Sequence, residues 1–575
     1  GLLTRDHSGW TKPALPWGMF AAATLGLGIM MGAAWAYESL TFGGYWAWDP
    51  VENASLVPWL LLISGIHTNL IFRHSGFSLK STYIFYVLSF VLVLYSTFLT
   101  RSGVLGDTSV HAFTDLGMNV QLFLFMNTLI WTAPMLAIKT VRGKWLTLGA
   151  FVLSNALGLL HPSFAFLSCI GGLIFFAFVI TRDQEIPTIR REEELYSREF
   201  WMFIGALIFF LSAAVIIAKT SVPVFNKVFA TQIAPPEDVE FSHNNIQIWV
   251  AVILGILTAI TQYFRYKDTP RKMLLKKLAI PTAIALVLSL IISFVQGVSY
   301  MKQGPGFWLA IHIAIFSAVY AIVGNAGYIW AGLRGKLKLA GGSVAHIGFG
   351  MVLLGILLSA GNKTVLSINT TGISPLKATD KENSYENTTL IKGQATDMGR
   401  FMVTYHKDSL DPRDRKRYYE IEFVAKDGKE RFFLYPDVIE NNKGGEGLTP
   451  NPDARHYFSK DIFAYITFLS DPDAKNKDTT AFRNLTVVVG DTMFYGNGMW
   501  VVNGLELNPG TGRYAAYAGD TILAADISVI AKDGRMYKSL PGFRLRGNTL
   551  EPFPDTVMSQ SLVFSLIRPG DFQKR

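Results

Sequence analysis

Long apolar runs with few charges are the feature of this sequence that most restricts its fold. Half of the 575 residues are hydrophobic and only 17% are charged, with a mean hydropathy of +0.29. A helix needs roughly 20 apolar residues to cross a hydrocarbon core of about 30 Å. Eleven runs approach this length, at residues 17–37, 56–72, 82–99, 118–138, 145–160, 164–180, 200–218, 246–264, 278–295, 307–330 and 339–360. The sequence therefore predicts a mainly α-helical bundle that crosses a membrane about eleven times.

The distribution of basic residues predicts how this bundle is oriented. Alternate loops between the runs hold eighteen Lys and Arg residues. The opposite loops hold only Arg101, Lys219, Lys227 and Lys302. Because Lys and Arg gather in cytoplasmic loops, the first set is predicted to be cytoplasmic. Residues 43–58, the loop 101–115 and everything after Gly361 then lie outside. Because the basic residues lie in these short loops, the net charge of +9 does not indicate nucleic-acid binding.

The composition changes after residue 361. Shorter apolar stretches alternate with polar residues at 401–406, 418–424, 463–469, 485–489, 500–505 and 522–530. Turn residues such as Asp427-Gly428 separate them, which is typical of antiparallel strands. We therefore predict a transmembrane domain over 17–361 and a β-rich, non-cytoplasmic domain over 362–575, built as a sandwich or small barrel.

The segment 43–58, GGYWAWDPVENASLVP, crowds aromatic residues beside glycines at the predicted outer surface. An aromatic belt is the simpler interpretation of Tyr45, Trp46 and Trp48. The functional interpretation is a rigid apolar shelf, where Gly43 and Gly44 let a flat ligand such as a porphyrin approach the backbone.

The two carboxylates of the same segment have two interpretations of equal weight. Asp49-Pro50-Val51-Glu52 has the pattern of a helix start, with Asp as N-cap, Pro at the first helical position and Glu three residues after the cap. Asp49 and Glu52 either cap a helix or take part in the chemistry.

Two histidines lie deep within predicted membrane spans, where an ionisable side chain is costly and indicates function. His67 lies roughly 17 Å below the outer end of its helix, hence about 13 Å above the inner face. His346 lies roughly 11 Å above the inner end of its helix, so the two can reach one level. Imidazoles from two helices make a b-type haem site, whereas the alternative is a pair of buried histidines bonded to neighbouring helices.

These residues resemble a known family. The segment 43–58 resembles the tryptophan-rich WWD signature of the cytochrome c assembly family. Residues 96–111 (STFLTRSGVLGDTSVH), 197–201 (SREFW) and 345–348 (AHIG) resemble further landmarks of that family. There is no CxxCH motif, so the chain is not itself a c-type cytochrome.

The resemblance implies a haem lyase of the bacterial cytoplasmic membrane, active on the periplasmic side. Trp46, Trp48, Asp49 and Glu52 would form the catalytic, haem-handling segment. The protein would take haem from a CcmE-like chaperone and attach it to the CxxCH thiols of apocytochrome c. A CcmH/CcmI-like, thiol-handling subunit would present the apocytochrome.

The resemblance also implies two haem b groups. His67 and His346 would hold a resident transmembrane haem b, which keeps the transferred haem b reduced. His111 would bind the transferred haem over the aromatic shelf, against the alternative of an exposed loop histidine. Arg101 would contact a propionate, or simply anchor the helix at the interface.

The second outer ligand has no obvious candidate. In the family it lies in a histidine-proline-proline motif upstream of the WWD segment, and no such motif precedes Trp17, so the N-terminal part of the family pattern is expected to be missing. His161 and His312 are weaker candidates, and we interpret His243 as a surface loop residue. Three other functions compete with the haem lyase: a CcsA-type haem delivery subunit, a haem transporter and a scaffold that binds no haem.

Overall fold

The computed structural model divides into two compact units, Gly1–Lys363 and Thr364–Arg575. It describes residues 1–39, 44–105, 117–189, 194–266, 268–295, 304–361, 364–369, 385–411, 413, 416–440, 448–458, 460–468, 483–510, 519–547 and 549–567.

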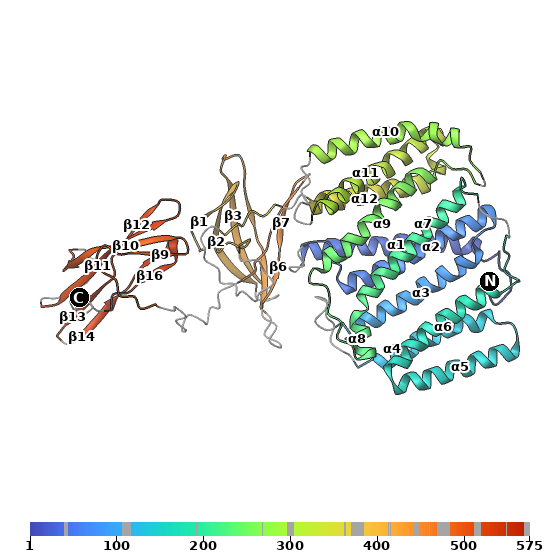
Figure 1. Ribbon diagram of the computed structural model, residues 1–575, viewed down its shortest axis with the longest axis horizontal. Helices are drawn as coiled ribbons and strands as arrows, with labels where there is room; N and C mark the ends of the chain where they lie inside the picture. Colours follow the sequence, from blue (N-terminus) through green and yellow to red (C-terminus); the bar gives the residue numbers. More distant parts are fainter. Residues whose placement is uncertain are drawn as a thin grey trace. The chain divides into compact units, whose positions relative to one another are not determined.

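The first unit consists of helices (Figure 1). Their bounds are α1 (Thr11–Glu38), α2 (Pro50–Ser75), α3 (Leu79–Arg101), α4 (Asn119–Ala137), α5 (Val141–Leu160), α6 (Pro162–Arg182), α7 (Arg198–Thr220), α8 (Val222–Phe229), α9 (Val239–Thr261), α10 (Arg271–Val295), α11 (Pro305–Gly327) and α12 (Gly341–Gly361). Eleven of the helices in the described residues are long and apolar enough to span a membrane, and each matches a predicted run. The protein is therefore a multi-pass membrane protein, and the predicted fold class is confirmed.

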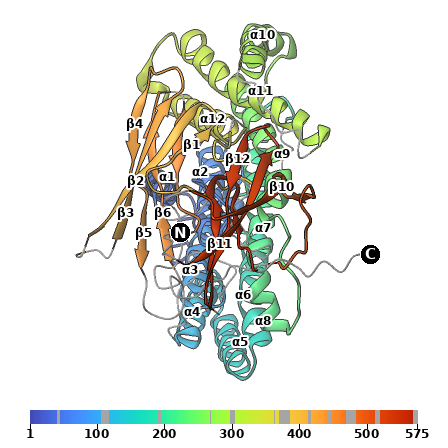
Figure 2. The ribbon, with the colours of Figure 1, turned by 90° about the vertical axis from the view of Figure 1, so that its left-hand side faces the viewer.

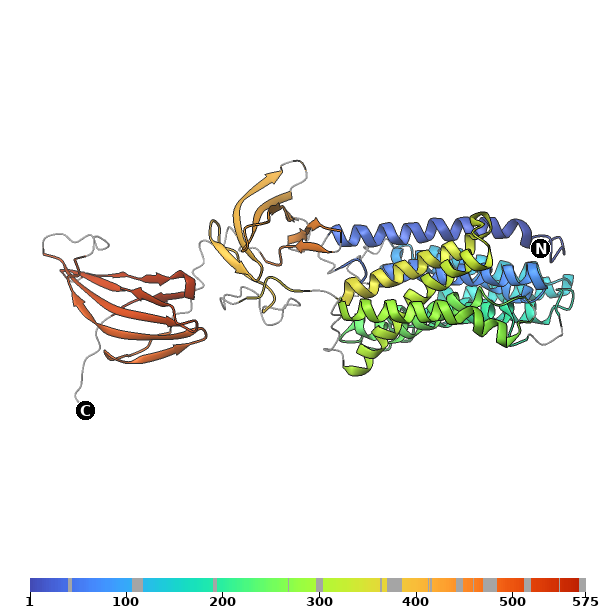
Figure 3. The ribbon, with the colours of Figure 1, turned by 90° about the horizontal axis from the view of Figure 1, so that it is seen from above.

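Two helices each occupy the centre of a group within this bundle. α2 packs on α1, α3 and α7, and α11 packs on α9, α10 and α12. The groups join where α7 packs on α9, while α5 and α10 lie at opposite ends of the bundle (Figures 1 and 2). α1 lies along one face of the bundle (Figure 3). Many of its side chains, Trp17 and Phe20 among them, are exposed to the surrounding medium, as expected for a helix at the lipid boundary.

The short helix α8 was not predicted, because eight residues are too few to give a span signal. It follows α7 after Ser221 and begins with Pro223 in its first turn. Its buried Val224 packs with Ala54 of α2 and with Leu99 and Leu105 at the end of α3. α8 therefore closes the end of the bundle at which α2 begins and α3 ends.

The second unit begins with an antiparallel sheet. Its strands are β1 (Ala395–Met398), β2 (Phe401–Asp411), β3 (Lys416–Ala425), β4 (Arg431–Leu434), β5 (Asp437–Glu440) and β6 (Leu448–Asn451), in the order β1-β2-β3-β5-β6 with β4 also on β3. β7 (Asp453–His456) and β8 (Asp461–Ala464) form a separate pair. Phe401, Phe423 and Phe432 fill the core of this sheet.

A second antiparallel sheet with its own core follows. Its strands are β9 (Thr492–Tyr495), β10 (Gly498–Leu507), β11 (Thr521–Ala531), β12 (Met536–Ser539), β13 (Gly542–Arg546) and β14 (Thr549–Phe553), in the order β14-β13-β11-β10-β9 with β12 also on β11. β15 (Asp555–Val557) pairs with β16 (Leu562–Phe564). The strand predicted at 485–489 is wrong, since these residues form no strand.

Candidate functional site

The aromatic segment ends in a helix cap. The Asp49 carboxylate accepts a hydrogen bond from the Val51 amide at 2.8 Å. Oε2 of Glu52 accepts from the amides of Ala47 and Asp49, each at 3.0 Å. This is a complete capping box with Pro50 at the first helical position. Both carboxylates therefore cap α2, as one of the two interpretations predicts. Their catalytic role stays a prediction.

Trp48 has an unusual backbone conformation, and its carbonyl oxygen is bonded to Asn53 of α2. Its φ of 55° lies in the left-handed region, which costs a bulky residue energy unless its surroundings hold it there. Nδ2 of Asn53 donates to the Trp48 carbonyl oxygen at 2.8 Å and to Oγ1 of Thr220 at 3.1 Å. Asn53 thereby ties the aromatic segment to the end of α7.

The first turns of α9 hold the Trp48 side chain. Nε1 of Trp48 donates to Oδ1 of Asn244 at 2.8 Å. The His243 ring stacks on the indole, with ring centres 4.8 Å and planes 10° apart. Trp46 meets Trp48 edge to face, with ring centres 5.8 Å apart. His243 thus covers one face of the indole.

His243 is the residue that sequence reasoning missed. The prediction of a surface loop residue is wrong, since His243 lies in α9 and is only 4% exposed. Its Nδ1 is buried without a hydrogen-bond partner in the described residues. The predicted span begins at residue 246 and leaves His243 outside it, and nothing local in the sequence indicates that the chain brings His243 to Trp48.

Tyr45 links the aromatic segment to α12. Its hydroxyl lies 2.8 Å from Oγ of Ser359, and it also donates to the Ile356 carbonyl oxygen at 3.4 Å. Burial raises the pKa of the Tyr45 hydroxyl above its usual value. Gly44 lies next to it, whereas Gly43 is outside the described residues. The segment therefore contacts the same helix that carries His346.

The predicted histidine pair does meet between α2 and α12. The ring centres of His67 and His346 are 6.3 Å apart and the planes are 12° apart. For rings that face each other through Nε2, two metal–imidazole bonds of about 2.0 Å and about 1.1 Å from each nitrogen to its ring centre span about 6.2 Å. A direct hydrogen bond of about 2.9 Å would bring the centres to about 5.1 Å. The spacing fits a metal between the rings.

Hydrogen bonds in the described residues use Nδ1 of both rings. Nδ1 of His67 donates to the Ile63 carbonyl oxygen at 2.8 Å, so the neutral ring has a free lone pair on Nε2. Nδ1 of His346 lies 3.0 Å from Nε2 of Gln262. Arg198 donates to Oε1 of the same amide. Metal binding through Nε2 of His346 requires a proton on Nδ1 and a turned Gln262 amide that presents its oxygen.

Three of the four other predicted ligand residues lie in the described part of the chain. His111 is outside the described residues. Arg101 is exposed in the last turn of α3, whose end packs beside the start of α2. His161 is the N-cap of α6 and accepts a hydrogen bond from the Ser163 amide. His312 lies within α11, 3.0 Å from Oγ of Ser293.

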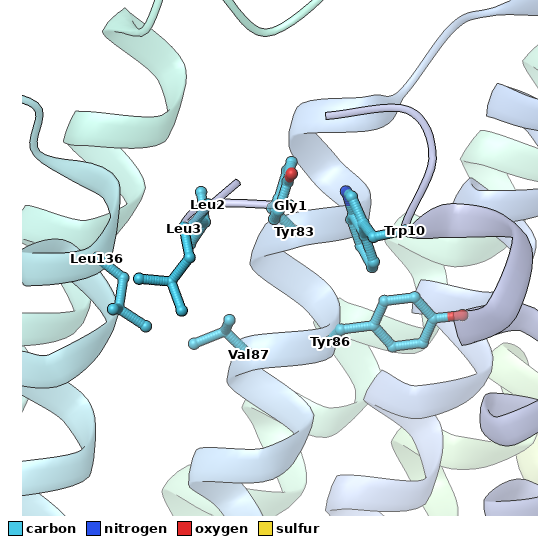
Figure 4. Close-up of a pocket in the computed structure, with 8 residues that line it drawn as sticks. All are labelled: Gly1, Leu2, Leu3, Trp10, Tyr83, Tyr86, Val87 and Leu136. Carbon is cyan, nitrogen blue, oxygen red and sulfur yellow. The ribbon is translucent and has the colours of Figure 1, made fainter. Parts of the chain in front are cut away.

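A pocket lies elsewhere, beside the first residues of the chain (Figure 4). Its lining comprises Gly1, Leu2, Leu3, Trp10, Tyr83, Tyr86, Val87 and Leu136. These residues surround the predicted cytoplasmic end of α3. None of them belongs to the aromatic segment or to the histidine pair, so this pocket is not the candidate site.

The chain is similar to several known proteins. Residues 4–105 match the family model described as cytochrome C assembly protein. The chain is 28% identical to the cytochrome c-type biogenesis protein CcmF of Pseudomonas aeruginosa over 62% of this chain and 48% of that protein. It is 26% identical to the CcmF of Escherichia coli over 78% of this chain and 58% of that protein. A solved structure named cytochrome c heme lyase CcmF is 18% identical, with a TM-score of 0.47, over 89% of this chain and 62% of that chain.

The eleven spans define a multi-pass membrane protein, and residues 4–105 are similar to the cytochrome C assembly family. The chain is similar to CcmF-type cytochrome c biogenesis proteins, so the predicted resemblance is confirmed. The chain spans about half the length of the curated relatives that it matches.

The capping box gives a direct test of the carboxylates. A Gln at position 52 still accepts from the amides of residues 47 and 49, whereas a Leu cannot. We expect Glu52→Gln to retain cytochrome c maturation within about twofold, and Glu52→Leu to destabilise the start of α2 by about 1 kcal/mol. Covalent haem in a reporter cytochrome is the measurement, with Asp49→Ser as a second cap-preserving variant. If Glu52→Gln loses maturation at a normal protein level, the negative charge of Glu52 takes part in the chemistry.

Proposed function

We propose that this protein handles haem during cytochrome c maturation and acts there as a haem lyase. The observation that carries the proposal is the His67–His346 pair, two imidazoles in membrane helices at a spacing that fits a metal between them. Both relatives described above are named cytochrome c-type biogenesis protein CcmF. The lyase activity, its substrates and its partners are inferences for this chain.

His67 and His346 would hold a resident haem b in the membrane. Such a haem supplies electrons, one at a time, within the bilayer. The chain fixes the orientation of the two rings, because Nδ1 of His67 is bonded to Ile63 and Nδ1 of His346 to Gln262. These second contacts set which ring nitrogen faces the gap.

The aromatic segment would hold the haem that is transferred. Trp46 and Trp48 offer apolar ring surface, and α9 keeps Trp48 from rotating. Each thioether forms when a cysteine S–H adds across a vinyl C=C, so the sulfur bonds to one carbon, the proton goes to the other and no electrons are consumed. The contribution of the protein is then to hold each thiol close to its vinyl group in the right orientation. His111 and Arg101 are proposed to bind the iron and a propionate of this haem.

The proposed orientation and partners follow from the loop charges and the family. The aromatic segment and the second unit would lie on the periplasmic side of a bacterial cytoplasmic membrane. A CcmE-like chaperone would supply haem, and a CcmH/CcmI-like subunit would present apocytochrome c.

Two measurements on the full chain test the function. The purified protein is expected to contain non-covalent haem b with a bis-histidine visible spectrum. Removal of its gene is expected to abolish covalent haem in the cell's c-type cytochromes. A purified protein without haem would support a scaffold, and unchanged cytochromes in the deleted strain would reject the role in maturation.

A further inference from the structure

The outer end of α7 carries a lysine without a carboxylate partner in the described residues. Nζ of Lys219 donates to the carbonyl oxygen and to Oγ of Ser242, at 2.6 and 2.7 Å. Both acceptors are neutral, and the described part of the chain places Lys219 in no ion pair. An ammonium group has three donors, so one remains, together with an uncompensated charge. A partly buried cation of this kind favours binding of an anion.

Two chains of contacts place Lys219 beside the aromatic segment. Ser242 is followed by His243, which stacks on Trp48. On the other side, Thr220 follows Lys219 and accepts from Asn53, which also holds the Trp48 carbonyl oxygen. α7 and α9 pack side by side here (Figures 1 and 2). Lys219 thus precedes Thr220, which bonds to Asn53, and donates to Ser242, which precedes the stacked His243.

Buried polar atoms without partners provide a second observation. Nδ1 of His243 is buried and unpartnered in the described residues, and so is Nε2 of Gln247 one turn further along α9. Gln247 faces α7, because its Oε1 accepts from Ser212 at 2.7 Å. An unsatisfied buried donor or acceptor costs roughly 1–3 kcal/mol. A ligand that brings oxygen acceptors to this interface would satisfy such groups.

We propose that Lys219, supported by His243, binds a carboxylate of the ligand held at Trp48. If that ligand is haem, the carboxylate is a propionate, and the inference rests on the proposed function to this extent. The ring of a porphyrin is flat and apolar, whereas its propionates are flexible and anionic. An aromatic surface beside one unpaired ammonium matches both parts. The site adds a cation in α7 to Arg101, the propionate contact inferred from the sequence.

The probe for this site is ferric haem compared with its dimethyl ester, whose carboxylates are blocked. Haem is added to the purified full chain in nanodiscs of zwitterionic lipid, and binding beyond the resident haem is followed by difference spectra. We expect Lys219→Met to weaken haem binding about tenfold, the value of one charge-assisted hydrogen bond, and to leave binding of the ester unchanged. Lys219→Arg should retain most of the affinity for haem.

The matched control is Lys227→Met. Lys227 is exposed on α8 and lies on the same predicted side of the membrane. Its replacement by Met removes the same charge as Lys219→Met. Equal weakening of haem and ester by Lys219→Met would overturn the proposal and assign Lys219 to packing. Unchanged haem binding in Lys219→Met would overturn it in favour of a contact with lipid phosphate or solvent.

Failure of the proposed function gives a different result. In that case the unaltered protein binds neither haem nor ester, and both inferences fall together. When the unaltered protein binds haem but Lys219→Met shows no selective loss, only the carboxylate site is rejected.

Discussion

Replacement of either His67 or His346 by Ala is expected to abolish the bis-histidine haem spectrum of the purified protein. Each imidazole would supply one axial position, so either loss leaves the iron with one strong ligand and converts it from low spin to high spin. Visible and electron paramagnetic resonance spectra of the purified variants measure this change. Added imidazole should restore the low-spin spectrum in the single variants, because a small ligand can replace the deleted ring.

His74→Ala is the matched control for this experiment. His74 lies on the same helix as His67, is exposed, and stacks on Tyr266 rather than facing α12. The control should keep the spectrum of the unaltered protein. A bis-histidine spectrum that persists in the double variant His67→Ala plus His346→Ala would reject the ligand assignment.

Release of Trp48 from α9 is expected to have the second large effect. Asn244→Leu leaves the indole N–H without its acceptor, at a cost of about 1–3 kcal/mol. His243→Ala removes the stacked ring, at about 0.5–1.5 kcal/mol. Because Trp48 has a left-handed backbone, we expect the loss of these contacts to let the segment relax and to lower cytochrome c maturation about tenfold or more.

Three comparisons make this prediction specific. Asn245→Ala alters the exposed neighbour of Asn244 and should have no effect on maturation. His243→Phe keeps an aromatic ring on the indole and should retain more activity than His243→Ala. The double variant Asn244→Leu plus His243→Ala should lose less than the sum of the single losses, since both contacts hold one side chain. Normal maturation in both single variants would show that the α9 contacts are dispensable.

The pattern of the sequence determined the membrane fold. Hydropathy over about 20 residues is a local property, and no tertiary contact is needed to place a helix in lipid. All eleven spans were therefore predictable, and so was the capping box at Asp49 and Glu52, which involves residues within one helical turn. The two antiparallel sheets were predictable in kind. The prediction of a strand at 485–489 was wrong because a short apolar run does not specify whether a pairing strand is available.

Only the tertiary structure decided which side chains meet. His67 and His346 are separated by 279 positions in the chain, and a depth estimate could place them at one level but not on facing sides of two helices. Asn244 reaches Trp48 across 196 positions, and His243 was mistaken for a surface residue. Helix packing sets these contacts through interactions between elements, which leave no local signal in either segment. The aromatic segment was recognisable from its sequence, whereas the histidine, asparagine and lysine around it became visible only in the fold.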